Sequence, residues 1–87
     1  MIVELFSRPG CHLCEEARKV VLAAARVHTF QFVERNVEES ADWERQFGQE
    51  IPVVFIDGHK AFKCRVNPAE LDRSLRAPRR PAKPRDI

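Results

Sequence analysis

The chain opens with an apolar run that is typical of a buried strand. Residues 2–6 are hydrophobic except for Glu4. Pro9-Gly10 then forms a turn signal. From residue 11 to about residue 26, apolar residues recur every three or four positions, namely Leu13, Ala17, Val20, Val21 and Ala24. This spacing predicts an amphipathic helix, so the chain is expected to begin as strand, tight turn and helix.

A second strand and a short helix follow. In residues 27–34, Phe30 and Phe32 alternate with polar neighbours, which predicts a strand. The intervening helix is about the length that a right-handed crossover needs, so the two strands should be parallel. Residues 41–47 place Trp43 and Phe47 on one helical face, and Gly48 is expected to end that helix as its C′ residue.

The last third predicts a hairpin and a capped helix. Residues 51–56 are rich in β-branched residues, Asp57-Gly58 is a hairpin signal, and residues 59–63 would return as the antiparallel partner. Asn67 followed by Pro68 is a typical helix start. The resulting order, β-α-β-α-β-β-α, predicts an α/β fold in which three helices cover a four-stranded mixed sheet.

Length and charge suggest one small domain and a basic tail. The chain has 87 residues, of which 44% are hydrophobic. Residues 1–76 are nearly neutral and carry every predicted element, whereas residues 77–87 are basic, rich in proline and without core residues. We therefore expect a domain at 1–76 and a disordered tail at 77–87. We expect no nucleic-acid partner, because the net positive charge comes from the tail alone.

The sequence also suggests a compartment. No apolar run approaches the roughly 20 residues of a membrane span, and no secretory signal pattern is visible. Three cysteines are an odd number, which argues against a fully paired secretory framework. We therefore expect a cytoplasmic monomer that does not contact membranes, and a Cys-x-x-Cys pair there is typically redox-active or metal-binding.

Two cysteines lie at the predicted turn between the first strand and the first helix. Cys11 would occupy the first turn of the helix, where unpaired backbone N–H groups and the macrodipole favour a thiolate. Arg8 and a protonated His12 would act in the same direction. Cys14 lies one turn further on the same face, close enough for a disulfide. The pattern predicts Cys11 as a nucleophile and Cys14 as the resolving thiol.

The chain resembles glutaredoxin-like proteins of the thioredoxin superfamily from residue 2 to about residue 75. The resemblance rests on Cys11-x-x-Cys14, Ile51-Pro52, Asp57-Gly58 and the capped last helix. It implies a thioredoxin fold and a dithiol–disulfide oxidoreductase that reduces protein or glutathione mixed disulfides. It also implies a cis peptide before Pro52, packed beside the Cys11 sulfur. The expected substrate-binding residues are Arg8, His12, Ile51, Pro52, Lys63 and Arg65.

The sequence departs from typical glutaredoxins at two places. It has Cys-His-Leu-Cys where they have Cys-Pro-Tyr-Cys, and Lys63-Cys64-Arg65 where they have a Gly-Gly pair and an acidic residue that hold glutathione. Lys63 and Arg65 could still attract a carboxylate. The electron donor therefore stays open between glutathione and a thioredoxin-reductase-type protein, and no tightly bound cofactor is expected.

Two other functions remain open at this point. One is a metal or iron–sulfur module that uses Cys11 and Cys14 with Cys64 or His12, although tetrahedral zinc needs four ligands and one Cys-x-x-Cys supplies half of them. The other is an interaction domain without catalysis. Cys64 is either a third reactive thiol or a small apolar residue that fills a gap, and we expect the latter. His28 and His59 are expected to be surface residues.

Overall fold

The computed structural model describes residues 1–76, so the tail predicted at 77–87 lies outside the described residues. The predicted order of elements is confirmed, with one additional 3-10 turn, η1, before the second α-helix. None of the helices in residues 1–76 is long and apolar enough to cross a membrane. The elements are β1 (Ile2–Ser7), α1 (His12–Ala24), β2 (Gln31–Asn36), η1 (Val37–Glu39), α2 (Ala41–Phe47), β3 (Val53–Ile56), β4 (His59–Lys63) and α3 (Pro68–Arg76).

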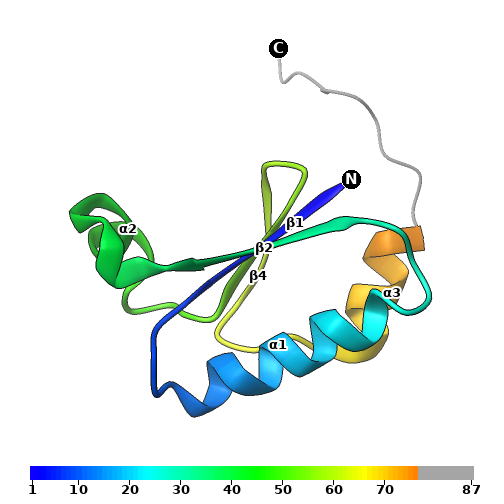
Figure 1. Cartoon of the computed structure of the whole chain (residues 1–87), viewed down its shortest axis with the longest axis horizontal. Helices are drawn as coiled ribbons and strands as arrows, with labels where there is room; N and C mark the ends of the chain where they lie inside the picture. The colour runs from blue at the N-terminus through cyan, green and yellow to red at the C-terminus, as the bar shows by residue number, and fades with distance from the viewer. Residues whose placement is uncertain (77–87) are drawn as a thin grey trace.

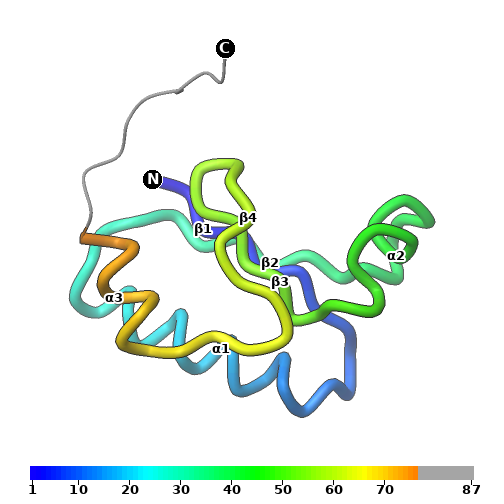
Figure 2. Tube along the Cα trace, turned by 180° about the vertical axis from the view of Figure 1, so that it is seen from behind, coloured from blue at the N-terminus to red at the C-terminus, as the bar shows by residue number. Residues whose placement is uncertain are grey.

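A four-stranded mixed sheet forms the centre of the fold. Its strand order is β2-β1-β3-β4. The pair β1–β2 is parallel, as the helical crossover predicted, whereas β1–β3 and β3–β4 are antiparallel. Helices α1 and α3 run side by side along one side of the sheet, and α2 lies apart from them at the other end (Figures 1 and 2). The helix that follows Cys11 therefore packs against the sheet through Ala17 and Val21.

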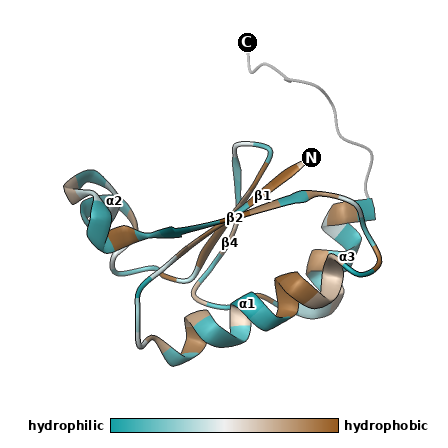
Figure 3. Cartoon of the chain, viewed as in Figure 1, coloured by the Kyte–Doolittle hydropathy of each residue, from teal (hydrophilic) through white to brown (hydrophobic). Residues whose placement is uncertain are grey.

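The two faces of the sheet have separate cores because strand side chains alternate. Val3 and Leu5 of β1 face α1 and α3, together with Val54 and Ile56 of β3. Phe6, the next residue of β1, joins the other core under α2. Figure 3 shows α1 as alternating hydrophobic and hydrophilic segments, as a helix with one buried face should be. The larger core buries Val3, Leu5, Ala17, Val21, Val54, Ile56, Leu71 and Leu75.

The second core is aromatic. The Phe6 ring lies 5.4 Å from the Trp43 ring in an edge-to-face arrangement and 4.7 Å from the Phe47 ring. Phe55 closes the cluster at 5.5 Å from Phe6. Because Phe6 comes two residues before Arg8, this cluster fixes the end of β1 and the start of the turn that leads to Cys11.

The predicted bounds of the second strand were wrong. We expected residues 27–34, but β2 covers Gln31–Asn36. The helical hydrogen bonding runs past α1, because the backbone N–H groups of Val27 and His28 both donate to the carbonyl of Ala24. Val27 is thereby turned into solvent, where it is 76% exposed. The strand can begin only after this last turn.

Local turn chemistry was predicted well, except at Gly48. Asp57 and Gly58 have φ values of 50° and 84°, as a tight hairpin turn requires. The side chain of Asn67 accepts a hydrogen bond from the backbone N–H of Glu70 at 3.0 Å, which caps α3. Gly48 does end α2, but with a right-handed φ of −56°. Steric room explains the glycine, because a Cβ there would meet the carbonyl oxygen and the carboxylate of Glu44 at 2.5 Å.

His28 is not a free surface residue. Its Nε2 lies 2.7 Å from Oδ1 of Asp72, and its side chain is only 15% exposed. Arg76 donates to the other oxygen of the same carboxylate at 3.0 and 2.6 Å. These contacts join the segment after α1 to α3. The hydrogen bond from His28, followed by that from Arg76, lowers the pKa of Asp72 below its ordinary value of 3.8.

The lowered pKa of Asp72 should make the difference in stability between the wild type and an Asp72 variant depend on pH. Since the pKa of Asp72 is lowered by folding, its contribution is present above the unfolded-state pKa of about 3.9 and is lost as the pH falls through the folded-state pKa. We expect Asp72→Asn to reduce the free energy of unfolding most above about pH 5, where the carboxylate is charged in both states. Urea unfolding at several pH values measures this. A gap between the two proteins that stays constant from pH 7 to below pH 3 would contradict the account.

Candidate active site

Cys11 is the N-cap residue of α1. Its backbone is extended, with φ −86° and ψ 114°, and its Sγ accepts a hydrogen bond from the backbone N–H of Cys14 at 3.2 Å. The preceding turn is closed by the backbone N–H of Cys11, which donates to the carbonyl of Arg8 at 3.2 Å, and Gly10 supplies the left-handed φ of 79°. The Cys11 side chain is half-buried. The sulfur therefore takes the place of the usual capping oxygen.

Cys14 lies behind Cys11 and is nearly closed off from solvent. It is 3% exposed. Burial, together with a hydrogen bond between its thiol and the Cys11 sulfur, raises the pKa of Cys14 to about 12. The backbone and the positive charge of Arg8 act in the opposite direction. At neutral pH Cys14 is therefore a protonated thiol directed at Cys11, while Cys11 remains partly accessible.

Arg8 joins the turn before Cys11 to the helix α2 and to η1. Its Nη2 donates to Oε2 of Glu44 at 2.8 Å and to the carbonyl of Gly48 at 3.3 Å. Its Nη1 lies 3.8 Å from Oε2 of Glu38. The hydrogen bond to Glu44 raises the pKa of Arg8, and the charges of Glu44, Glu38 and Cys11 add to that effect. Arg8 thus interacts electrostatically with Cys11, but its guanidinium already has partners.

His12 lies on the solvent side of the first helical turn. Its side chain is 82% exposed, and Nε2 is 3.2 Å from Oε2 of Glu16, one turn further along α1. A carboxylate at that distance offsets the charge of a protonated imidazole. Although His12 lies between the two cysteines in the sequence, its side chain is turned toward Glu16.

The peptide bond between Ile51 and Pro52 is cis, as the resemblance implied. Pro52 is buried, and its carbonyl accepts the backbone N–H of Cys64 at 2.9 Å. The carbonyl of Glu50 accepts the same N–H group at 2.8 Å. The proline loop and the segment after β4 are consequently side by side.

The expectation that Cys64 fills an interior gap was wrong. Cys64 is exposed and has a left-handed φ of 70°, a conformation that glycine adopts more readily than cysteine. Its paired N–H holds the backbone in this bend, and the bend turns the side chain outward. Cys64 therefore takes the left-handed geometry at the place where typical glutaredoxins have glycine.

Lys63 and Arg65 lie on either side of Cys64. Nζ of Lys63, the last residue of β4, is 3.8 Å from Oε2 of Glu50, which precedes the proline loop. Arg65 borders a groove of about 340 Å³ between α1 and the segment before α3. The groove does not include Cys11. It is lined by Leu13, Glu16, Ala17, Val20, Cys64, Arg65, Val66, Asn67 and Pro68.

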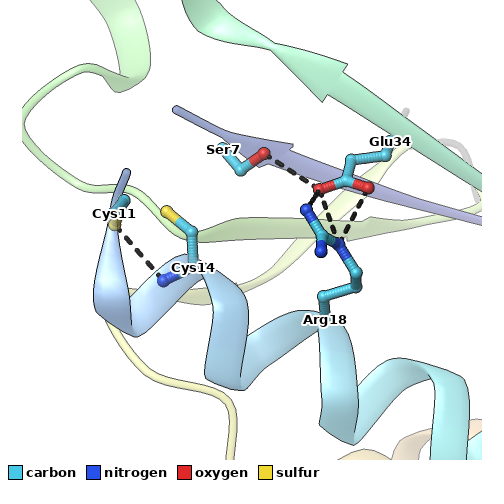
Figure 4. A network of polar contacts seen from close by, with 5 residues as sticks. All are labelled: Ser7, Cys11, Cys14, Arg18 and Glu34. Atoms are coloured by element: carbon cyan, nitrogen blue, oxygen red, sulfur yellow. Dashed lines mark hydrogen bonds and ion pairs between the residues drawn. The ribbon is translucent and has the colours of Figure 1, made fainter. Parts of the chain in front are cut away.

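A polar network that the sequence did not reveal supports the helix beneath the cysteines. Figure 4 shows Arg18 reaching from α1 to Glu34 of β2, with Ser7 of β1 on the same carboxylate. Arg18 donates to Glu34 at 2.9 to 3.1 Å, and Oγ of Ser7 donates to it at 3.2 Å. Ser7 is the buried polar residue of the described chain, at 8% exposure. The only signal in the sequence was the spacing of four residues between Cys14 and Arg18, which puts them on one helix face.

The metal-binding alternative gains no support from this geometry. Within residues 1–76, no three side chains of His, Cys, Asp or Glu come together as a ligand set. Cys11 and Cys14 are adjacent, but Cys64 is on a different segment and faces solvent. Two thiolates alone supply half of a tetrahedral zinc site.

The different environments of the three cysteines predict an order of alkylation. At pH 8, iodoacetamide should modify Cys11 and Cys64 first, and Cys14 at least about 100-fold more slowly, because a buried thiol with a high pKa offers almost no thiolate. Peptide mass mapping over time measures this. Unfolded protein is the control, and there all three should react at similar rates. Modification of Cys14 as fast as Cys64 in the folded protein would show that the site is built differently.

Comparison with known proteins gives consistent results. The model of the family described as Glutaredoxin-like domain (DUF836) matches residues 2–76. The chain is 27% identical over 75 residues to the "Glutaredoxin-like protein YDR286C homolog" of Dictyostelium discoideum, with 79% of this chain and 69% of that protein covered. Among solved structures, the structural genomics target XcR50 from X. campestris has a TM-score of 0.69 at 27% identity, with 84% of this chain and 93% of that chain covered.

Two thioredoxins share the fold at lower identity. A single-residue mutant of a thioredoxin from Halobacterium salinarum has a TM-score of 0.62 at 19% identity, covering 85% of this chain and 70% of its own. Thioredoxin 1 of Thermosipho africanus has a TM-score of 0.59 at 18% identity, covering 86% and 94%. The fold is therefore a thioredoxin fold, and the family supports a redox-type function in general. The chain belongs to the glutaredoxin-like family of the thioredoxin superfamily.

Proposed function

We propose that this protein is a dithiol–disulfide oxidoreductase that uses Cys11 and Cys14 to reduce disulfides. The observation that carries the proposal is the arrangement of the two sulfurs. Cys11 is half-buried at the N-cap of α1 and accepts the N–H of Cys14, and the protonated thiol of Cys14 lies behind it. A helix N-terminus stabilises the negative charge of a thiolate, so Cys11 suits the role of attacking group.

The first half of the reaction transfers the substrate to the protein. The Cys11 thiolate attacks one sulfur of the substrate disulfide, a bond forms between these two sulfurs, and the substrate S–S bond breaks. The electron pair of the broken bond leaves on the second substrate sulfur, which takes a proton from water. The product is a mixed disulfide between Cys11 and the substrate.

The second half releases the substrate. The sulfur of Cys14 attacks the Cys11 sulfur, a Cys11–Cys14 bond forms, and the mixed disulfide breaks. The proton of the Cys14 thiol balances the substrate thiolate, which leaves as a thiol. Two electrons have then passed from the two cysteines to the substrate. While Cys11 is a thiolate, its hydrogen bond with Cys14 and its charge help to raise the pKa of Cys14. Both effects are lost once the Cys11 sulfur is bonded to substrate, so Cys14 becomes able to attack only after the first step.

The cycle takes a disulfide at one end and needs external thiols at the other, to return the protein to its reduced form. An external dithiol or two molecules of glutathione would reduce the Cys11–Cys14 disulfide by the same exchange in reverse, so no tightly bound cofactor is needed. We propose a cytoplasmic setting, where such reductants are present. Protein disulfides and glutathione mixed disulfides are the proposed substrates, held by the backbone next to Pro52 in strand-like hydrogen bonds.

Cysteine variants test this proposal. Turbidity and coupled assays with insulin as the disulfide substrate should show that Cys11→Ser lowers the rate by about 1,000-fold or more, since removing a nucleophile abolishes the covalent route. Cys14→Ser should accumulate a mixed disulfide and turn over slowly. Cys64→Ser is the matched control and should keep a rate within about two-fold of the wild type, because Cys64 has no role in either step.

The oxidised protein offers a second check on the same assignment. After mild oxidation, peptide mass mapping should find a bridge between Cys11 and Cys14. Activity that survives Cys11→Ser, or a bridge from either residue to Cys64, would refute the assignment of roles.

A further inference from the structure

Arg8, whose positive charge interacts with Cys11, is paired within the protein itself. The guanidinium of Arg8 has Glu44 at 2.8 Å, the carbonyl of Gly48 at 3.3 Å and Glu38 at 3.8 Å. Arg8 is only two residues before the turn glycine of the Cys11 loop, so it is well placed to meet a substrate anion. Its donors, however, are directed toward α2 and η1.

The contact between Arg8 and Glu44 is built into the packing of α2. Gly48 lies one turn after Glu44, and a Cβ at that position would come within 2.5 Å of Oε2 of Glu44. The missing side chain leaves room for the carboxylate, and the carbonyl of the same glycine accepts from Arg8 at 3.3 Å. The ion pair therefore has a fixed place in the structure rather than depending on two long surface side chains alone.

A second carboxylate, that of Glu50 just before the proline loop, pairs with lysines of β4. Glu50 precedes Ile51-Pro52, pairs with Lys60 and lies 3.8 Å from Nζ of Lys63. Hydrogen bonding to Lys60 lowers the pKa of Glu50, so it is charged at neutral pH. Lys63 faces Val53 across the β3–β4 pair, at the end of the sheet where the proline loop lies.

Of the three basic residues expected to bind substrate, two, Arg8 and Lys63, are thus paired internally. Within residues 1–76, Arg65 is the one of the three without an ion pair to a carboxylate. A substrate anion at Arg8 or Lys63 would have to displace Glu44 or Glu50, or share the cation with it. Each exchange costs the internal pair and leaves a carboxylate close to the incoming one.

We propose that Glu44 and Glu50 determine substrate specificity by competing with anionic ligands, so that the site favours disulfides in uncharged or basic polypeptide segments over glutathione-like peptides with free carboxylates. This inference rests on the proposed function and names its substrate class. Exposed ion pairs contribute little individually, so each carboxylate should account for about a two- to five-fold difference in affinity, and the two together for about ten-fold.

The experiment uses ligands that cannot undergo disulfide exchange. S-methylglutathione carries two carboxylates, and its diethyl ester carries none. NMR titration of the full chain measures the dissociation constant of each. The wild type should bind the diester several-fold more tightly than the free acid.

Isosteric variants then test the two residues. Glu44→Gln and Glu50→Gln should each lower the dissociation constant of S-methylglutathione about two- to five-fold, and the double variant about ten-fold, with little change for the diester. Asp42→Asn is the matched control. It removes the same charge from α2, but Asp42 pairs with Arg45 and not with Arg8 or Lys63, so it should leave both constants unchanged.

Three results would overturn the inference. They are equal binding of acid and ester by the wild type, an unchanged affinity for the acid in the double variant, and an equal gain in Asp42→Asn. The comparison of acid with ester in the wild type needs no variant to fold. Because the thioethers bind without reacting, these outcomes are independent of the insulin assay, whose failure would instead refute the redox function.

Discussion

The hydrogen bond from the backbone N–H of Cys14 to the sulfur of Cys11 connects the fold to the chemistry. The first N–H groups of a helix have no partner within it, and here a sulfur accepts one of them at 3.2 Å. That contact requires Cys11 to lie at the N-cap and not inside the helix. It also requires Cys14 to be the third residue of the first turn, which carries its side chain into the interior. One turn of helix therefore gives two thiols opposite properties, one half-exposed and one buried with a raised pKa.

The rest of the molecule holds this turn in place from several directions. The aromatic core around Phe6 fixes the end of β1, and the hydrogen bond from Arg8 to Glu44 joins the following turn to α2. On the other face, Ala17 and Val21 pack α1 against the sheet, and Arg18 ties it to β2 through Glu34. Glu44, which positions Arg8, is also one of the two carboxylates proposed to compete with anionic ligands. Because Arg8 is held in an internal ion pair, a substrate anion has to compete with Glu44 for it.

Features encoded by neighbouring residues could be predicted from the sequence. The hairpin at Asp57-Gly58 and the cap at Asn67 depend on local conformational preferences, and the cysteine pair depends on a strand, a turn and a helix in succession. Features that depend on distant contacts could not be predicted. Glu44 is 36 residues from Arg8, and His28 is 44 residues from Asp72, so their pairing follows from the way the helices pack. Cys64 was misjudged for a similar reason, because two carbonyls of the proline loop hold it in a left-handed, exposed bend.

The central claim is that the sulfur of Cys11, and no other, forms the bond to substrate. Cys14 then resolves the mixed disulfide. Trapping tests this most directly. The Cys14→Ser protein is mixed with a dye-labelled peptide disulfide, quenched with acid and analysed by intact mass and peptide mapping. The account predicts one peptide per chain, attached at Cys11, and release of that peptide on the same timescale in the wild type. Attachment at Cys64 in place of Cys11, or no stable adduct in the variant, would contradict it.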